Sequence, residues 1–348
     1  MNIIKDYFRD LQQQSALGWN RFWFTPADPA TLGLIRLLAG AMLLYTHAVW
    51  LLDLEAFFGA QSWINRSVAE ATQAGGYQWS HLWLCRSPGA LWGAHLLALG
   101  VFTLLMVGLY TRPVSILAYL ITVSYANRVP AALFGLDQIN ALLALYLMLG
   151  PSGAAFSLDL WVLRRQARRA GKELPGPVPS VSANVAIRLI QLHLCVLYLF
   201  AGLSKLQGAA WWDGTAIWSA VANLEYQSID MTWLVRWPLM VNLLTHVSVA
   251  WEISYCALVW PRLTRPIVIF LALPLHLGIA ICLGMSTFGL AMLIANMAFV
   301  SPGLVRCLIG ADQAPRTKSV ERLPLKKPAY FLRKKVDAAA RSLESQRP

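Results

Sequence analysis

Long apolar runs alternate with short polar segments along most of the chain. Each run approaches the roughly 20 residues that an α-helix needs to cross the hydrocarbon core of a bilayer. Eight such runs occur, at about 32–52, 90–110, 113–129, 136–151, 184–206, 239–260, 265–284 and 286–302. Polar residues interrupt the third and fourth, so a re-entrant hairpin is the alternative to two full spans there. We therefore predict an all-α integral membrane protein, a bundle of about eight transmembrane helices.

The N-terminal segment, residues 1–29, has a different pattern. Apolar residues recur there at helical spacing, with charged residues off that stripe: Ile4, Tyr7, Phe8 and Leu11 against Lys5, Asp6, Arg9 and Asp10. This pattern predicts an amphipathic helix lying in the membrane interface beside the first span. A helix docked on the cytoplasmic side without lipid contact is the alternative. The acids in this segment also argue against a signal peptide.

The polar segments divide the rest of the chain. Residues 30–302 form the predicted transmembrane domain, and residues 164–183 form a linker between two four-helix halves, running from a basic cluster into a proline-rich stretch. Residues 303–348 form a basic tail. Clusters of lysine and arginine beside a membrane attract anionic lipid headgroups.

Composition supports a membrane protein, because 57% of the 348 residues are hydrophobic and only 13% are charged, against roughly 25% charged in soluble domains. The net charge of +12 would suit nucleic acid, an anionic membrane or an orientation signal. With the N-terminus inside, 22 of the 29 basic residues fall on the cytoplasmic side and four outside. The positive-inside rule therefore predicts a multi-pass protein with both termini cytoplasmic, and nucleic acid is not needed to explain the charge.

Ionisable residues inside predicted spans are costly and mark candidate sites. They are Arg36, Arg188, His193, Lys205, His246, Glu252 and His276, with Asp137 near a helix start. For the arginines and Glu252 the leading structural interpretation is an ion pair between helices; for Asp137 it is a helix cap, and for His193 or His246 a hydrogen bond between helices. Neither these residues nor the five scattered cysteines have the spacing of a metal site, so no metal is expected.

Lys205 has two interpretations. It shares one helix stripe with Tyr198, seven residues earlier, and Gly202 lies close by, where a second backbone or a flat ligand could approach. A lysine desolvated in an apolar site can act as a base near neutral pH. A lysine near the outer end of its span can instead extend to the headgroups.

Several segments then resemble one family, the vitamin K-dependent gamma-carboxylase and its bacterial HTTM relatives. The segment YLFAGLSKL at 198–206, followed by Trp212, resembles the family's lysine-bearing motif. Four others occur in the expected order: GLIR at 33–36, GLYTRP at 108–113, EISY at 252–255, and RPI at 265–267 with His276. The resemblance covers about residues 30–302.

The resemblance implies a reaction and a site. In the carboxylase, the lysine matching Lys205 deprotonates vitamin K hydroquinone; oxygenation then yields a strong base that removes a γ-proton of glutamate, CO2 is captured and the quinol becomes an epoxide. It implies Lys205 as catalytic base and Tyr198, Gly202, Trp212 and His276 as pocket residues. It also implies a reduced menaquinone or vitamin K-type quinone, O2 and CO2 as cofactors, and a peptide or protein substrate.

The chain departs from the carboxylase pattern in three places. Only about 46 residues follow the last predicted span, where the carboxylase has a large domain. Asp137 lies near the position of a carboxylase histidine, and Ser204 replaces one of two adjacent lysines. Two hypotheses follow: a quinol-dependent epoxidase or carboxylase with Lys205 as base, or a non-catalytic protein of the same fold that assists maturation or export of a partner.

Overall fold

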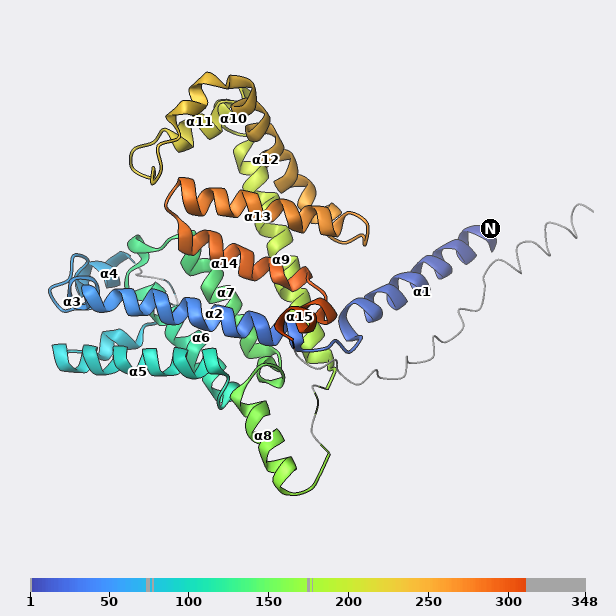
Figure 1. Ribbon diagram of the computed structural model, residues 1–348, viewed down its shortest axis with the longest axis horizontal. Helices are drawn as coiled ribbons and strands as arrows, with labels where there is room; N and C mark the ends of the chain where they lie inside the picture. The colour runs from blue at the N-terminus through green and yellow to red at the C-terminus, as the bar shows by residue number, and fades with distance from the viewer. Residues whose placement is uncertain (1, 73–75, 77, 174–175, 177, 311–348) are drawn as a thin grey trace, which may run out of the picture. The chain divides into compact units, whose positions relative to one another are not determined.

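The computed structural model describes residues 2–72, 76, 78–173, 176 and 178–310, and these residues form helices and connecting segments without a strand (Figure 1). The α-helices are α1 (Asn2–Phe24), α2 (Ala30–Val49), α3 (Leu54–Phe58), α4 (Arg66–Thr72), α5 (Pro88–Val107), α6 (Thr111–Arg128), α7 (Gly135–Leu149), α8 (Leu158–Arg169), α9 (Val181–Lys205), α10 (Ala209–Trp212), α11 (Ala216–Val221), α12 (Pro238–Leu258), α13 (Arg265–Cys282), α14 (Ser286–Asn296) and α15 (Pro302–Ile309). Short 3-10 helices are η1 (Trp50–Leu52), η2 (His81–Leu84), η3 (Pro130–Ala132), η4 (Ser152–Ala154), η5 (Thr232–Arg236) and η6 (Met297–Phe299). The prediction of an all-α fold is confirmed.

Local sequence explains where several helices begin. The hydroxyls of Ser87, Ser157, Ser180 and Ser301 accept hydrogen bonds from backbone N–H groups in the first turns of α5, α8, α9 and α15. These bonds satisfy donors that a helix start leaves without partners. The linker predicted at 164–183 is helical at its ends, because α8 continues to Arg169 and α9 begins at Val181.

Among the described residues, four helices are long and apolar enough to cross a membrane: Ala30–Leu52, Pro88–Val107, Val181–Lys205 and Arg265–Cys282. A fifth span results if Ser286–Phe299 and Pro302–Ile309, which meet at a 120° bend, count as one. α7 is apolar but has only 15 residues. The fold is therefore that of an integral membrane protein.

Two large hydrophobic clusters hold most of the described helices together, and a third, small one joins α11, η5 and α12. One large cluster joins α2, α7, α9, α12, α13 and α14, and the other joins α2, α5 and α6 with the short segments outside them. α2 contributes to both clusters, and its close neighbours include α5, while α9 packs mainly on α12. The candidate site lies where α9, α12 and α13 meet, on the first cluster.

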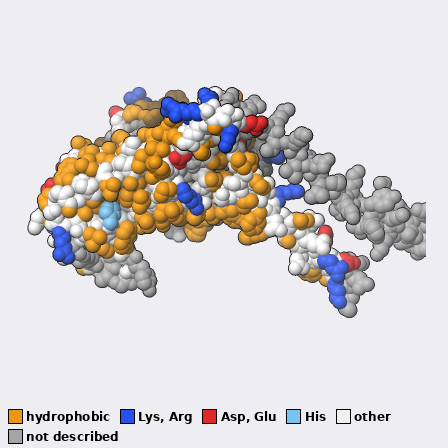
Figure 2. Space-filling model, turned by 90° about the horizontal axis from the view of Figure 1, so that it is seen from below, with side chains coloured by type: hydrophobic (Ala, Val, Ile, Leu, Met, Phe, Trp, Pro, Cys, Tyr) orange, Lys and Arg blue, Asp and Glu red, His pale blue; other side chains and the backbone are white. Residues whose placement is uncertain are grey.

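The surface drawn in Figure 2 is covered largely by hydrophobic side chains, as expected of a protein surrounded by lipid. α1 is a single helix whose apolar stripe is exposed, with Ile4, Tyr7 and Phe8 each more than 60% accessible. This helix has the amphipathic form predicted for residues 1–29. The predicted tail, residues 303–348, begins within α15, and its part from 311 onward lies outside the described residues.

Candidate functional site

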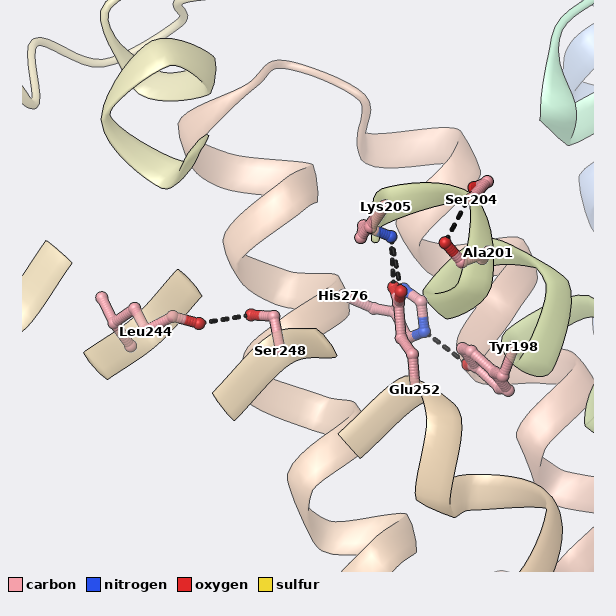
Figure 3. Close-up of polar contacts among 8 residues, drawn as sticks. All are labelled: Tyr198, Ala201, Ser204, Lys205, Leu244, Ser248, Glu252 and His276. Carbon is pink, nitrogen blue, oxygen red and sulfur yellow. Dashed lines mark hydrogen bonds and ion pairs between the residues drawn. The ribbon is translucent and has the colours of Figure 1, made fainter. Parts of the chain in front are cut away.

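Lys205 and Glu252 form an ion pair between α9 and α12 (Figure 3). The Lys205 ammonium donates to both carboxylate oxygens, with Nζ 2.7 Å from Oε1 and 2.5 Å from Oε2 of Glu252. The Glu252 side chain is 10% exposed and the Lys205 side chain 24% exposed. The charge of Lys205 is therefore neutralised by a buried carboxylate on the neighbouring helix. This geometry differs from a lysine side chain that extends to the lipid headgroups without a protein partner.

The close approach of α9 and α12 depends on Gly202. A Cβ atom placed on Gly202 would lie 2.6 Å from Cγ1 of Ile253 and 3.2 Å from Cβ of Glu252. Any larger residue would push the two helices apart. The helix that approaches closely at Gly202 is thus α12. The same helix supplies Glu252, which neutralises Lys205 one turn further along α9.

A chain of hydrogen bonds lies beside the ion pair. The Tyr255 hydroxyl donates to Oδ1 of Asn296 at 2.7 Å, and Nδ2 of Asn296 donates to the Tyr198 hydroxyl oxygen at 2.8 Å. The Tyr198 oxygen is in turn 2.6 Å from Nε2 of His276. All four side chains are buried, so this chain runs through the apolar interior and connects α12, α14, α9 and α13.

The direction of the bonds assigns the proton positions on His276. Because Asn296 donates to the Tyr198 oxygen, the Tyr198 hydroxyl has its own proton available for Nε2 of His276. In a neutral imidazole the proton then resides on Nδ1. Nδ1 is buried and has no hydrogen-bond partner among the described residues. The site therefore presents one buried N–H donor that suits an acceptor oxygen.

Aromatic rings enclose this chain. The ring of Tyr198 packs against that of Tyr255, with centroids 4.3 Å apart and planes tilted by 43°, and meets the ring of Trp251 edge to face at 4.9 Å. Lys205 lies 5.3 Å from the ring of Trp211, a cation–π distance. Trp212, the residue implied by the resemblance, is 64% exposed, and its indole N–H donates to the Leu206 carbonyl. The described contact of the ammonium with a tryptophan ring is thus made by Trp211, the neighbour of the residue that the resemblance implied.

Arg36 is fully buried and binds main-chain carbonyls. Its guanidinium donates to the carbonyl oxygens of Leu105, Met106, Ser152 and Phe156, over distances of 2.5 to 3.2 Å. The ion pair expected for Arg36 is replaced by these four contacts. They join α2 to the last turn of α5 and to the segment after α7, and none of them involves a residue of the lysine site.

Arg188 and Asp137 also have structural partners. Arg188 donates to the Gln191 side chain, and its guanidinium lies 4.4 Å from the Phe22 ring of α1. The Asp137 carboxylate accepts the backbone N–H of Phe134 at 2.8 Å, which caps the start of α7. Asp137 thus contributes to the cap of α7 from the third helical position, whereas the N-cap residue is Phe134. An ion pair of Arg188 is not formed in the described part of the chain.

The structure adds site residues that the sequence did not indicate. Asn296 and Tyr255 connect the candidate pocket residues, yet neither is ionisable at neutral pH, so a search for charges inside spans passes over them. The pair of tyrosine and asparagine separated by 41 positions carries no local signal. Tyr255 lies within the EISY segment, which was the one available indication.

A second polar cluster lies among α2, α5 and α6. His95 bonds to the Tyr125 hydroxyl at 2.7 Å and to the His47 carbonyl at 3.0 Å. His47 and Asp137 line a small cavity of about 30 Å³, room for about one or two waters. His47 and His95 fall inside the first and second predicted spans but were not among the sequence-based candidates.

The side chains of this site could take part in acid–base chemistry inside a membrane protein. It brings together an amine, a carboxylate and an imidazole donor among aromatic rings. Within the described ranges, no group of three or more histidine, cysteine or acidic side chains is arranged to bind a metal ion. These residues define the class: a polytopic membrane protein with a buried lysine–glutamate pair.

The comparison with protein families gives its identity at the family level. The model of the HTTM domain matches residues 24–303, which is most of the chain. The protein belongs to the HTTM family, and this match relates it to the membrane domain of gamma-carboxylase. No curated protein and no solved structure matches it significantly.

Proposed function

We propose that this protein is a membrane enzyme that uses a reduced quinone, with Lys205 as general base and an epoxidase or gamma-carboxylase outcome. The observation that carries the proposal is the Lys205–Glu252 pair placed beside the hydrogen-bond chain that ends in His276. A reduced menaquinone or vitamin K-type quinone, with O2 and CO2, would supply the acidic hydroxyl, the electrons and the carbon. A peptide or protein glutamate is the proposed substrate.

The residues present fit such a ligand. A quinol oxygen can accept the free N–H of His276, and the aromatic rings of Tyr198 and Trp251 offer flat apolar contacts. Gly202 is occupied by α12, so the ligand would approach from the side of His276 and Trp211. No metal is needed for this arrangement.

Glu252 prepares Lys205 for its role. An ammonium cannot accept a proton, so Lys205 must first become neutral. The 2.5 Å bond from Nζ to Oε2 provides the route, because a proton moved along it leaves an uncharged amine beside a protonated carboxyl group. If a ligand separates Lys205 from Glu252, burial favours the neutral amine and the neutral carboxyl group over two separated charges. The amine can then accept the proton of a quinol hydroxyl.

The enzyme proposal predicts that Lys205→Ala abolishes oxygen uptake driven by reduced menaquinone in vesicles containing the purified protein. Lys205→Arg is expected to abolish it as well, because arginine keeps the charge and the contact with Glu252 but does not release its proton. Oxygen consumption is followed with an electrode, and epoxide formation by mass spectrometry.

Exposed Ser204 provides the matched control, since its hydroxyl bonds only to the Ala201 carbonyl of its own helix. Ser204→Ala should retain full activity. Wild-type protein that consumes no oxygen with any naphthoquinol or benzoquinol would contradict the proposal, as would full activity in Lys205→Arg.

The alternative is a non-catalytic protein of the same fold that helps a partner peptide or protein to mature or be exported. The bidentate contact of Lys205 with Glu252 favours it, because a carboxylate that close stabilises the charged lysine. In that case Lys205→Arg would keep the cellular phenotype while no quinol supports turnover.

We further propose that all eight predicted spans cross the membrane, with both termini cytoplasmic. Most of each apolar run is helical, although the run at 286–302 extends over α14, η6 and the start of α15, and the basic residues gather in the segments assigned to the cytoplasm. Single cysteines placed at 168 in α8 and at 227 between α11 and η5 are expected to label from opposite sides of the membrane. A cysteine-free background is used, and labelling from one side would contradict the eight-span arrangement.

A further inference from the structure

A large apolar groove lies between α2, α13 and the bent pair of α14 and α15. Its volume is about 1130 Å³, larger than the roughly 300–1,000 Å³ of ordinary ligand pockets. Each of the four helices contributes apolar residues to its walls, for example Ala41, Phe270, Leu290 and Leu308. Many of these wall residues are open to the surroundings, with Leu308 72% exposed. The groove therefore opens toward lipid.

The length of the groove suits a lipid chain. The lining residues extend along Ser286–Phe299, a stretch of 14 residues in α14 and η6. At 1.5 Å per residue this is about 20 Å, somewhat more than the roughly 15 Å that half of a 30 Å hydrocarbon core provides. A single acyl chain of one leaflet can lie along the whole groove.

One end of the groove is positively charged. Two arginines are the only charged residues among the described lining, and no acidic residue belongs to it: Arg262, between α12 and α13, and Arg265, the first residue of α13. Both fall in a segment assigned to the cytoplasmic side. An anion at this end would meet two cations without a competing carboxylate.

The hydrogen bonds show which donors are free. Arg265 uses Nε for the Val259 carbonyl and one Nη2 proton for the Trp260 carbonyl. A guanidinium has five N–H donors, so three remain. Arg262 is exposed, and within the described residues it has no ion pair.

Arg306 on α15 provides an instructive contrast. Its guanidinium binds Asp28 through two bonds, of 2.6 and 3.1 Å, and it does not line the groove. Its charge is neutralised inside the protein. Arg306, which does not line the groove, is thus neutralised by Asp28, whereas no carboxylate among the described lining residues neutralises Arg262 or Arg265.

We propose that this groove binds an anionic glycerophospholipid of the cytoplasmic leaflet, with its phosphate at Arg262 and Arg265 and an acyl chain along α14 between α2 and α13. Neither Lys205 nor Glu252 lines the groove, although Asn296 of the neighbouring hydrogen-bond chain does, and the lipid proposal does not depend on the enzyme proposal. It gives the attraction to anionic headgroups, expected from the basic segments, one defined place in the fold.

The proposal is tested by lipid binding to the full-length purified protein. Delipidated protein is titrated with phosphatidylglycerol or with phosphatidylcholine of the same acyl chains, and the bound lipid is counted by native mass spectrometry. Wild-type protein is expected to prefer phosphatidylglycerol. Arg262→Gln should weaken phosphatidylglycerol about fivefold, as one lost contact near 1 kcal/mol implies, without changing phosphatidylcholine.

Two more variants separate the headgroup from the chain. Leu290→Trp narrows the groove and should reduce binding of both lipids, whereas Leu97→Trp, on an exposed position of α5 outside the groove, should not. Arg168→Gln on α8 removes an exposed cytoplasmic-side charge away from the groove and should leave the preference intact. An equal loss in Arg168→Gln and Arg262→Gln, or unchanged binding in Leu290→Trp, would overturn the proposal.

Discussion

Arg36→Lys is expected to lower the free energy of unfolding by about 3 kcal/mol, because a lysine ammonium cannot reach the carbonyls that the guanidinium fork holds. Arg36 is 0% exposed and donates to four main-chain oxygens contributed by two separate turns. Each buried carbonyl left without a donor costs roughly 1 kcal/mol or more. Lysine keeps the positive charge, so the lost stability comes from the hydrogen bonds that only the guanidinium can form.

The turn after α5 packs directly against the Arg36 guanidinium, which leaves no space for another side chain to donate to these carbonyls. Gly108 adopts a left-handed conformation with φ of 71°, and a side chain there would collide with the Arg36 guanidinium. Unfolding in detergent, followed by the loss of monodisperse protein on heating, measures the effect. Arg112→Lys is the matched control, since Arg112 is exposed and donates to the Met148 carbonyl alone. Equal losses in the two variants would contradict this account.

Lys205→Met is expected to destabilise the protein by about 3 kcal/mol, at the lower end of the range for breaking a buried pair, because the lysine is partly exposed. The change leaves the Glu252 carboxylate inside the bundle without its partner. Combining Lys205→Met with Glu252→Leu should recover most of the stability, since two apolar side chains can replace a buried ion pair at little cost.

The same double variant separates structure from chemistry. If Lys205 is the base, the double variant folds well and consumes no oxygen with a reduced quinone. If the pair only joins α9 to α12, the double variant keeps both its stability and its cellular function. Stability that fails to recover in the double variant would show that the two charges do not act as a pair.

The positions of the helices followed closely from the apolar runs. The run at 184–206 became α9, Val181–Lys205, and the run at 265–284 became α13, Arg265–Cys282. Local features account for this success, because a helix satisfies its backbone within itself and its ends depend on nearby caps such as Ser180.

The candidate site was predictable residue by residue but not contact by contact. Lys205 and Glu252 were separate candidates on two spans, and their 47-residue separation carries no signal that they meet. The partners of Arg36 were unpredictable for a different reason: main-chain carbonyls are present at every residue, so only the fold shows which of them face a buried guanidinium.

Hydrophobic length and charge asymmetry determine that this chain enters a membrane and where its helices begin and end, because the bilayer acts on each segment through its own composition. The motif around Lys205 further indicated the family. Packing of distant helices determines the rest: which carboxylate neutralises Lys205, which nitrogen of His276 is left as a donor, and where a lipid chain can lie against Arg262. Those features arise between segments, and the sequence of one segment does not contain them.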